Sequence, residues 1–141
     1  MCSRARSRRA ARWLIGYLQT SRPVNIVELQ GTIGSAPAID RKKGFEEVIK
    51  SNPRLQIIRS QSGEFTRAKG KEARESFLKQ RDKKIDVLFA HNDDMAIGAI
   101  QAIADAGLKP GTDVLVVSID GLKEAVQAIV DGKINCVVEC N

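Results

Sequence analysis

The feature that most constrains the fold is a short apolar run that passes through polar residues into a helix-forming segment, and residues 87–111 contain its clearest example. There VLFA is followed, after one histidine, by Asn92, Asp93 and Asp94, and then by the small, apolar stretch MAIGAIQAIADAG. Asn and Asp are favoured helix N-caps, and they also line ligand sites at the carboxyl ends of strands in open α/β sheets. The junction alone fits both roles. Its recurrence along the chain gathers polar residues at one edge of the implied sheet, which favours a small-molecule site.

The same alternation divides the whole chain into strands and helices. Apolar runs predict five strands, at residues 24–29, 55–60, 85–90, 114–119 and 134–139, and helical spacing predicts five helices, near residues 10–19, 36–50, 67–80, 93–106 and 123–131. Turn-forming residues agree with this division, because Asn52-Pro53 follows the second helix, Pro110-Gly111 follows the fourth and Asp131-Gly132 follows the last.

The order of the elements predicts the fold class. Continuous apolar runs such as VLVVSI are typical of strands covered on both faces, and intervening helices imply right-handed, parallel βαβ units. We therefore expect an α/β fold, a Rossmann-like three-layer lobe with a five-stranded, mainly parallel sheet. A chain of 141 residues suits one domain. We expect residues 23–141 to form the lobe and residues 1–22 to form a basic leader that runs into the first helix.

The positive charge of the chain is concentrated in that leader. The net charge is +6, and residues 1–22 hold six arginines and no acid, which leaves 17 basic and 17 acidic side chains in the rest. A nucleic-acid-binding domain would carry a basic face with base-reading side chains. We therefore expect a solvated leader and no specific nucleic-acid partner. The apolar run at residues 13–18 is too short for a secretory signal peptide.

Neither membrane insertion nor a metal site is expected. No run reaches the ~20 apolar residues of a membrane span. Cys2, Cys136 and Cys140 make an odd set, and the last two would lie about 13 Å apart on one strand at roughly 3.3 Å per residue, so we expect free thiols. His91 is the single histidine, which leaves a zinc cluster almost without ligands. No cofactor is expected.

Polar residues follow each predicted strand and should share one edge of the sheet. These junctions hold Gly31-Thr32, Glu64-Phe65, Asn92-Asp93, Asp120-Gly121 and Glu139-Cys140. Carboxylates, amides and hydroxyls exchange hydrogen bonds with sugar hydroxyls, and an aromatic ring covers the apolar face of a sugar. Arg41, early in the second helix, could reach back with a forked donor. The pattern predicts a neutral, polyhydroxylated ligand.

Several of these residues also have a purely structural interpretation. Phe65 could belong to the core, and Asp120 could be a turn or cap residue. Arg41 could instead form a surface ion pair with Asp40 or Glu46. The sequence by itself leaves both interpretations open for each residue.

Catalytic chemistry finds little support. GTIGSA lacks the third glycine of a dinucleotide fingerprint and the Lys-Ser/Thr pair of a P-loop. His91 has no Ser or Cys near it in sequence, and GxSxG is absent, so we expect no enzyme. A phospho-receiver shares this five-stranded layout and is an alternative, with Asp93 and Asp94 as acidic residues. The first predicted strand, however, ends in Gln30-Gly31 without an acidic pair.

Four segments around these junctions resemble the periplasmic sugar-binding proteins of bacterial ABC importers, relatives of the ribose-binding protein, and most of all the galactofuranose-binding members. They are VELQGTIGSAPAIDRKKGF, IIRSQSGEFTRAKGKE, AHNDDMAIGAIQAIADAGLKPG and SIDG, which cover nearly all of residues 24–121, with a looser likeness to residue 139. The resemblance implies two hinged α/β lobes that close over a sugar, of which this chain matches most of one. It also implies that the ligand contacts of this lobe come from Arg41, Phe65, Asn92, Asp120 and Glu139.

By this resemblance the function is that of the solute-binding component of an ABC carbohydrate importer. Its ligand would be a monosaccharide, namely an aldose, and the furanose form is included. Its protein partner would be the permease of the importer, and it would act in the periplasm. The chain contains no export signal and no first lobe, and MCSRARS does not resemble the family, so we expect a truncated fragment with weak or no binding alone. The sensing lobe of a LacI-type regulator is an alternative, although residues 2–18 are too short for a helix-turn-helix headpiece.

Overall fold

The computed structural model describes residues 2–19, 22–79 and 84–139. Within these residues five strands form one sheet in the order β2-β1-β3-β4-β5, and each neighbouring pair is parallel. The strands are β1 (Val24–Gln30), β2 (Leu55–Ser62), β3 (Val87–Ala90), β4 (Leu115–Asp120) and β5 (Cys136–Glu139). The helices are α1 (Cys2–Tyr17), α2 (Ala36–Ile49), α3 (Arg67–Leu78), α4 (Asp93–Asp105) and α5 (Lys123–Val130).

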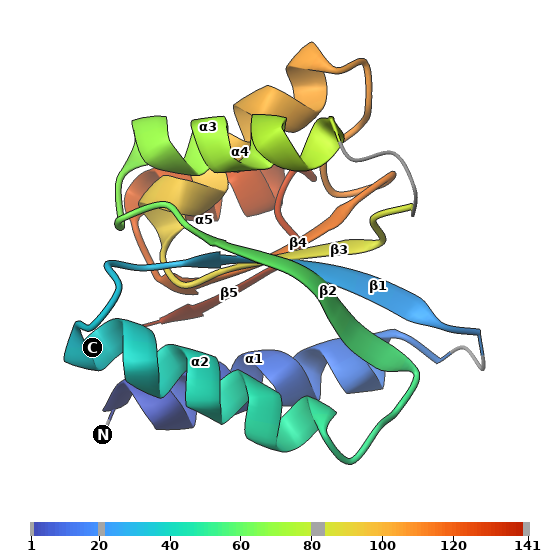
Figure 1. Ribbon diagram of the computed structural model, residues 1–141. Helices are drawn as coiled ribbons and strands as arrows, with labels where there is room; N and C mark the ends of the chain where they lie inside the picture. Colours follow the sequence, from blue (N-terminus) through green and yellow to red (C-terminus); the bar gives the residue numbers. More distant parts are fainter. Residues whose placement is uncertain (1, 20–21, 80–83, 140–141) are drawn as a thin grey trace.

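Helices cover both faces of the sheet. Figure 1 shows α1 and α2 below it and α3, α4 and α5 above it, with the carboxyl ends of the strands directed to the left. The expected three-layer α/β lobe with a parallel sheet is confirmed. Because parallel strands are joined through helices, all five carboxyl ends lie at the same edge, and the residues that follow them meet there.

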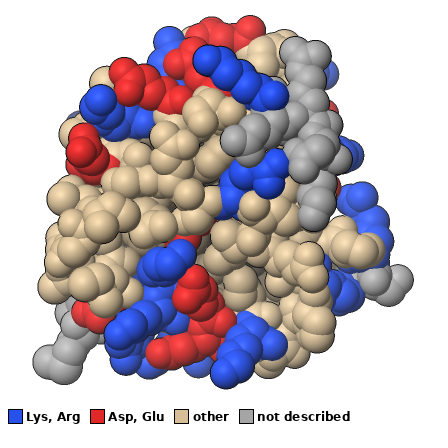
Figure 2. All heavy atoms as spheres, in the orientation of Figure 1, with Lys and Arg blue, Asp and Glu red and all other residues tan. Residues whose placement is uncertain are grey.

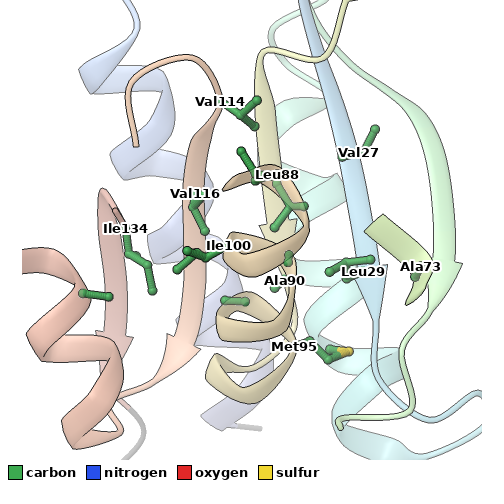
Figure 3. Close-up of a cluster of buried hydrophobic side chains, with 14 of the residues drawn as sticks. Val27, Leu29, Ala73, Leu88, Ala90, Met95, Ile100, Val114, Val116 and Ile134 are labelled. Atoms are coloured by element: carbon green, nitrogen blue, oxygen red, sulfur yellow. The ribbon is translucent and has the colours of Figure 1, made fainter. Parts of the chain in front are cut away.

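The apolar runs of the strands supply two cores, one on each face. Val27 and Leu29 of β1 join the cluster between the sheet and α3, α4 and α5, whereas Val24 and Ile26 join the cluster under α1 and α2. Figure 3 shows the first cluster, in which Met95 of α4 lies among strand side chains. Each fully buried Val, Leu or Ile contributes roughly 1.5–3 kcal/mol relative to exposure, so a strand that is apolar on both faces is held from both sides.

The predicted bounds agree with the structure within two residues at each end, except for the first helix. The prediction began that helix at residue 10, but α1 begins at Cys2. The arginine-rich segment is therefore part of the helix rather than a leader before it. Arginine and alanine both favour helices, and this segment is rich in both.

The expectation that this segment is solvated is wrong. Ser7, Ala10, Ala11 and Leu14 are fully buried, at the i, i+3, i+4 and i+7 spacing of one helix face. That face packs against α2, where Gly44 permits the close approach, because a Cβ atom there would meet the carbonyl oxygen of Arg4. Arg4 and Arg8 form ion pairs with carboxylates of α2.

Two further features concern the surface. Within the ranges described, no helix combines the length and apolarity that crossing a membrane requires. On the face in Figure 2, basic and acidic side chains alternate over the helical layers and form no extended surface of one sign. Ion pairs between α1 and α2 account for part of this pattern, since Arg8 Nε donates to Glu47 Oε2 at 2.8 Å.

Candidate functional site

Arg41 and Asp120 meet at the carboxyl edge of the sheet. Arg41 projects from α2, the residue is only 7% exposed, and its Nη2 atom lies 3.7 Å from Oδ1 of Asp120 at the end of β4. Its Nη1 atom donates a hydrogen bond to the backbone carbonyl of His91. The alternative of a surface ion pair with Asp40 or Glu46 is therefore wrong. Asp40 pairs instead with Arg4 at 3.6 Å, and Glu46 pairs with Lys42 at 3.0 Å.

The ring of Phe65 lies between Arg41 and the loop after β1. The Arg41 guanidinium carbon is 5.5 Å from the ring centroid, within the range of a cation–π contact. Gly31 makes room for the ring, because a Cβ atom there would lie 1.9 Å from Phe65 Cζ. Phe65 is half-buried and also packs against the upper core, so it belongs to both core and edge.

The backbone that carries Phe65 is strained. Glu64 and Phe65 have φ values of 51° and 61°, in the left-handed region that non-glycine residues rarely adopt. Asn92, itself 7% exposed, helps to hold this turn, because its Nδ2 donates to the Phe65 carbonyl at 3.2 Å. Its Oδ1 accepts from the Met95 amide at 3.1 Å and caps α4. Asn92 thus fills the capping role and also holds the turn that carries Phe65.

Asp120 occupies an unusual position at the end of β4. Its φ of 150° is positive, and its side chain is partly buried. Burial raises the pKa of the Asp120 carboxyl, the Arg41 guanidinium opposes this, and the negative charges of Asp93 and Asp94 raise the pKa further. The Asp120 carboxylate is therefore a hydrogen-bond acceptor whose negative charge is partly offset by the Arg41 guanidinium.

Glu139 is the neighbour of Asp120 across the β4–β5 ladder. Its side chain is exposed, and its Cγ would lie 2.8 Å from a Cβ atom at Gly121. Its backbone carbonyl accepts from Arg6 Nε at 2.6 Å. The structure therefore clusters Arg41, Phe65, Asn92 and Asp120, and it places Glu139 at the margin of that cluster beside Asp120.

Asp93 has a structural role. It is fully buried, and its carboxylate accepts from Ser118 Oγ at 2.7 Å and from the amides of Gly121 and Leu122 at 2.8 and 2.7 Å. These bonds fix the turn from β4 into α5, directly beside Asp120. A carboxylate saturated in this way is not available as a phosphoryl acceptor, which argues against the phospho-receiver alternative.

A buried polar network lies behind the edge, and the sequence prediction did not include it. The Gly31 amide donates to His91 Nδ1 at 3.1 Å, so the ring proton lies on Nε2, which is 3.0 Å from Glu28 Oε2. The other Glu28 oxygen accepts from Lys42 at 2.8 Å and Ser60 at 2.7 Å. Burial would raise the pKa of Glu28, but its hydrogen-bonding and charge interactions with His91, together with the hydrogen bonds from Lys42 and Ser60, lower it to about 2. The signal was available, since Glu28 interrupts the apolar run VNIVELQ.

The structure describes only some of the residues on which the cysteine and metal expectations rest. Cys136 has a free thiol, and burial raises its pKa to about 11, although the charge of Arg9 opposes this. Cys140 lies outside the described residues. In the part of the chain that the structure describes, no three His, Cys, Asp or Glu side chains are grouped as metal ligands.

Comparison with known proteins identifies the family. A model described as a periplasmic binding protein domain matches residues 4–139. The chain is 57% identical to the galactofuranose-binding protein YtfQ of Escherichia coli K12 over 129 residues, which are 90% of this chain and 40% of that protein. A crystal structure from Mycobacterium smegmatis in complex with β-D-fucofuranose matches with a TM-score of 0.94 and 51% identity, over 99% of this chain and 46% of that one.

A third relative agrees with these two. The periplasmic binding protein of the arabinose ABC transporter from Shewanella sp. ANA-3, bound to α- and β-L-arabinofuranose, matches with a TM-score of 0.93 and 48% identity. This match covers 99% of the chain and 46% of that protein. The chain thus spans less than half the length of each of these relatives. The predicted resemblance is confirmed, and the chain belongs to the family of periplasmic binding protein domains.

Proposed function

We propose that this chain is a sugar-binding lobe of the solute-binding component of a bacterial ABC carbohydrate importer. It acts in the periplasm, delivers its ligand to the importer permease and performs no chemistry on it. The observation that carries the proposal is the cluster of Arg41, Phe65, Asn92 and Asp120 at the carboxyl edge of the sheet. Glu139 is a fifth contact, from the margin of the cluster.

The distance between Arg41 and Asp120 suits a ligand with adjacent hydroxyls. At 3.7 Å the two groups attract each other without a direct hydrogen bond. A sugar hydroxyl can therefore accept from the guanidinium while its neighbour donates to the carboxylate. Both side chains keep their places without ligand, because the carbonyl of His91 holds Arg41 and the β4–β5 ladder holds the backbone of Asp120.

The aromatic ring and the ligands of the relatives support a furanose. The Phe65 ring is half-buried, and an aromatic ring that is partly exposed can cover the C–H surface of a sugar. One relative is a galactofuranose-binding protein, and two related structures contain fucofuranose and arabinofuranose. We therefore propose an aldose in its furanose form as the ligand.

A single lobe should bind such a sugar weakly. Hydrogen bonds at a wet surface contribute about 0.5–1.5 kcal/mol each, and association must first offset the loss of translational freedom. Closure by a second lobe would desolvate the ligand and strengthen these bonds. The proposed site is therefore half of a clamp.

The test joins this chain to the first lobe of the Escherichia coli relative and measures binding by calorimetry. We expect galactose to bind, and we expect Arg41→Ala or Asp120→Ala to weaken binding on the order of thirtyfold, since each removes a charged partner of the sugar hydroxyls that lobe closure would bury. Asp40→Ala is the matched control, because Asp40 pairs with Arg4 away from the edge. Binding that survives both site variants would refute the site, and conversion of the sugar would refute the non-enzymatic function.

A further inference from the structure

A large cavity lies at the opposite edge of the sheet from the proposed sugar site. Its volume is about 1020 Å³, at the upper end for ligand pockets. Residues at or just before the amino ends of three strands line it, among them Val24 of β1, Asp86 before β3 and Leu115 of β4. The end of α1 and the second half of α3 complete its wall.

Arg74 of α3 lines this cavity, and its charge is not balanced by the surrounding protein. The side chain is 1% exposed, and its Nε and Nη1 atoms have no hydrogen-bond acceptor among the described residues. Burial lowers the pKa of the guanidinium to about 10, so it stays charged at neutral pH. A buried cation without a partner is costly, and an anion in contact with it would offset that cost.

The two carboxylates that also line the cavity each accept a backbone hydrogen bond. Asp86 Oδ2 accepts from the Asn25 amide at 2.9 Å, and Asp113 Oδ2 accepts from the Lys109 amide at 2.7 Å. Neither carboxylate accepts a hydrogen bond from Nε or Nη1 of Arg74 in the ranges that the structure describes. Arg22 and Lys84, both exposed, add two further positive charges to the lining.

The rest of the lining is mainly apolar. It includes the side chains of Leu18, Val24, Phe77, Val114 and Leu115, of which Val24, Phe77 and Val114 are buried. An inorganic anion would leave these side chains without contacts, whereas a carboxylate with a hydrocarbon body would meet both parts of the wall.

We propose that this cavity binds a medium-chain carboxylate, with its headgroup on Arg74 and its hydrocarbon chain against Phe77 and the apolar strand ends. The site is separate from the proposed sugar site, at the other edge of the sheet, and does not depend on it. Its ligand class differs as well, since one edge would take a neutral polyol and the other an amphipathic monoanion.

The experiment measures thermal unfolding of the full chain with sodium octanoate at concentrations below its micelle range, with 1-octanol, sodium acetate and sodium sulfate as comparison probes. We expect octanoate to raise the Tm and the other three to have little effect. Equal stabilisation by sulfate, or no shift with octanoate, would overturn the proposal. Equal stabilisation by octanol would show an apolar site that does not need Arg74, and it would overturn the proposal as well.

Two variants separate the headgroup contact from nonspecific effects. Arg74→Met should raise the Tm of the ligand-free protein, because it removes the unpaired buried charge, and should weaken octanoate binding on the order of tenfold or more. Lys71→Met, on the same helix but outside the cavity lining and paired with Asp105, should leave the octanoate response unchanged. If Arg74→Met does not fold, the unmodified chain provides the test. We then expect NMR to detect contacts between the octanoate methylenes and the Phe77 ring. Their absence would refute the site.

Discussion

The Nε2 atom of His91 lies 3.0 Å from Oε2 of Glu28, and both side chains are fully buried. This contact joins two neighbouring strands behind the proposed sugar site. The opposite ring nitrogen of His91 holds the Gly31 amide, and the backbone carbonyl of His91 holds Arg41. The pair therefore positions both the loop under Phe65 and the guanidinium that would meet the ligand.

Glu28 should make the stability of the fold depend on acid pH. Its pKa is about 2 in the folded chain and 4.5 ordinarily, so the folded state favours the ionised carboxylate. The resulting stabilisation, about 3 kcal/mol, is present above pH 4.5 and is lost as the pH falls toward 2. Urea unfolding between pH 7 and pH 2.5 should give a flatter pH profile for Glu28→Gln than for the unmodified chain. Glu47→Gln, at an exposed ion pair, is the control, and equal flattening by both would contradict the assignment to Glu28.

Asp93 and Asp94 are adjacent in sequence but should differ sharply in their effect on stability. Asp93→Asn keeps one carbonyl oxygen for three donors, Ser118, Gly121 and Leu122, and should lower the free energy of unfolding by about 2–4 kcal/mol. Asp94→Asn disturbs only an exposed ion pair with Arg67 and should cost less than about 1 kcal/mol. Chemical denaturation of the two variants is the measurement, and equal losses would refute the role assigned to Asp93.

The fold was largely predictable because it depends on local patterns. Each strand is a continuous apolar run, and Asn92 and Ser35 mark helix starts by residue type. The first helix was the exception. The arginines suggested a solvated segment, but a helix can bury one face while it exposes the other. The spacing of Ser7, Ala10 and Leu14 places these three residues on the buried face.

The candidate site was predictable as a set of positions but not as a set of contacts. Strand ends of a parallel sheet converge, so Phe65, Asn92 and Asp120 could be grouped without coordinates. Their partners are set by tertiary packing between distant segments. Nothing in the local sequence indicates that Arg41 turns away from Asp40 toward Asp120, or that His91 faces Glu28.

Cys136 should react slowly with thiol reagents in the folded chain. Burial raises its pKa to about 11, so the thiolate at pH 7.5 is far scarcer than for an ordinary cysteine. Where the fraction of thiolate limits the rate, we expect iodoacetamide to alkylate the folded chain on the order of a hundredfold more slowly than the chain unfolded in urea. The measurement uses a Cys2→Ser, Cys140→Ser variant so that one thiol reports. Equally fast alkylation with and without urea would contradict the burial of this thiol.

Gly31 and Gly16 provide a matched pair for testing the placement of Phe65. A Cβ atom at Gly31 would overlap the Phe65 ring, whereas one at Gly16, near the end of α1, meets nothing within 4 Å. Gly31→Ala should therefore destabilise the fold by about 1–3 kcal/mol through overpacking. Gly16→Ala should stabilise it by up to about 1 kcal/mol through helix propensity. Displacement of the ring would also separate it from Arg41, which is 5.5 Å away. We expect the Phe65 ring resonances to move in Gly31→Ala and not in Gly16→Ala, and unchanged ring resonances in both would show that Phe65 does not rest on Gly31.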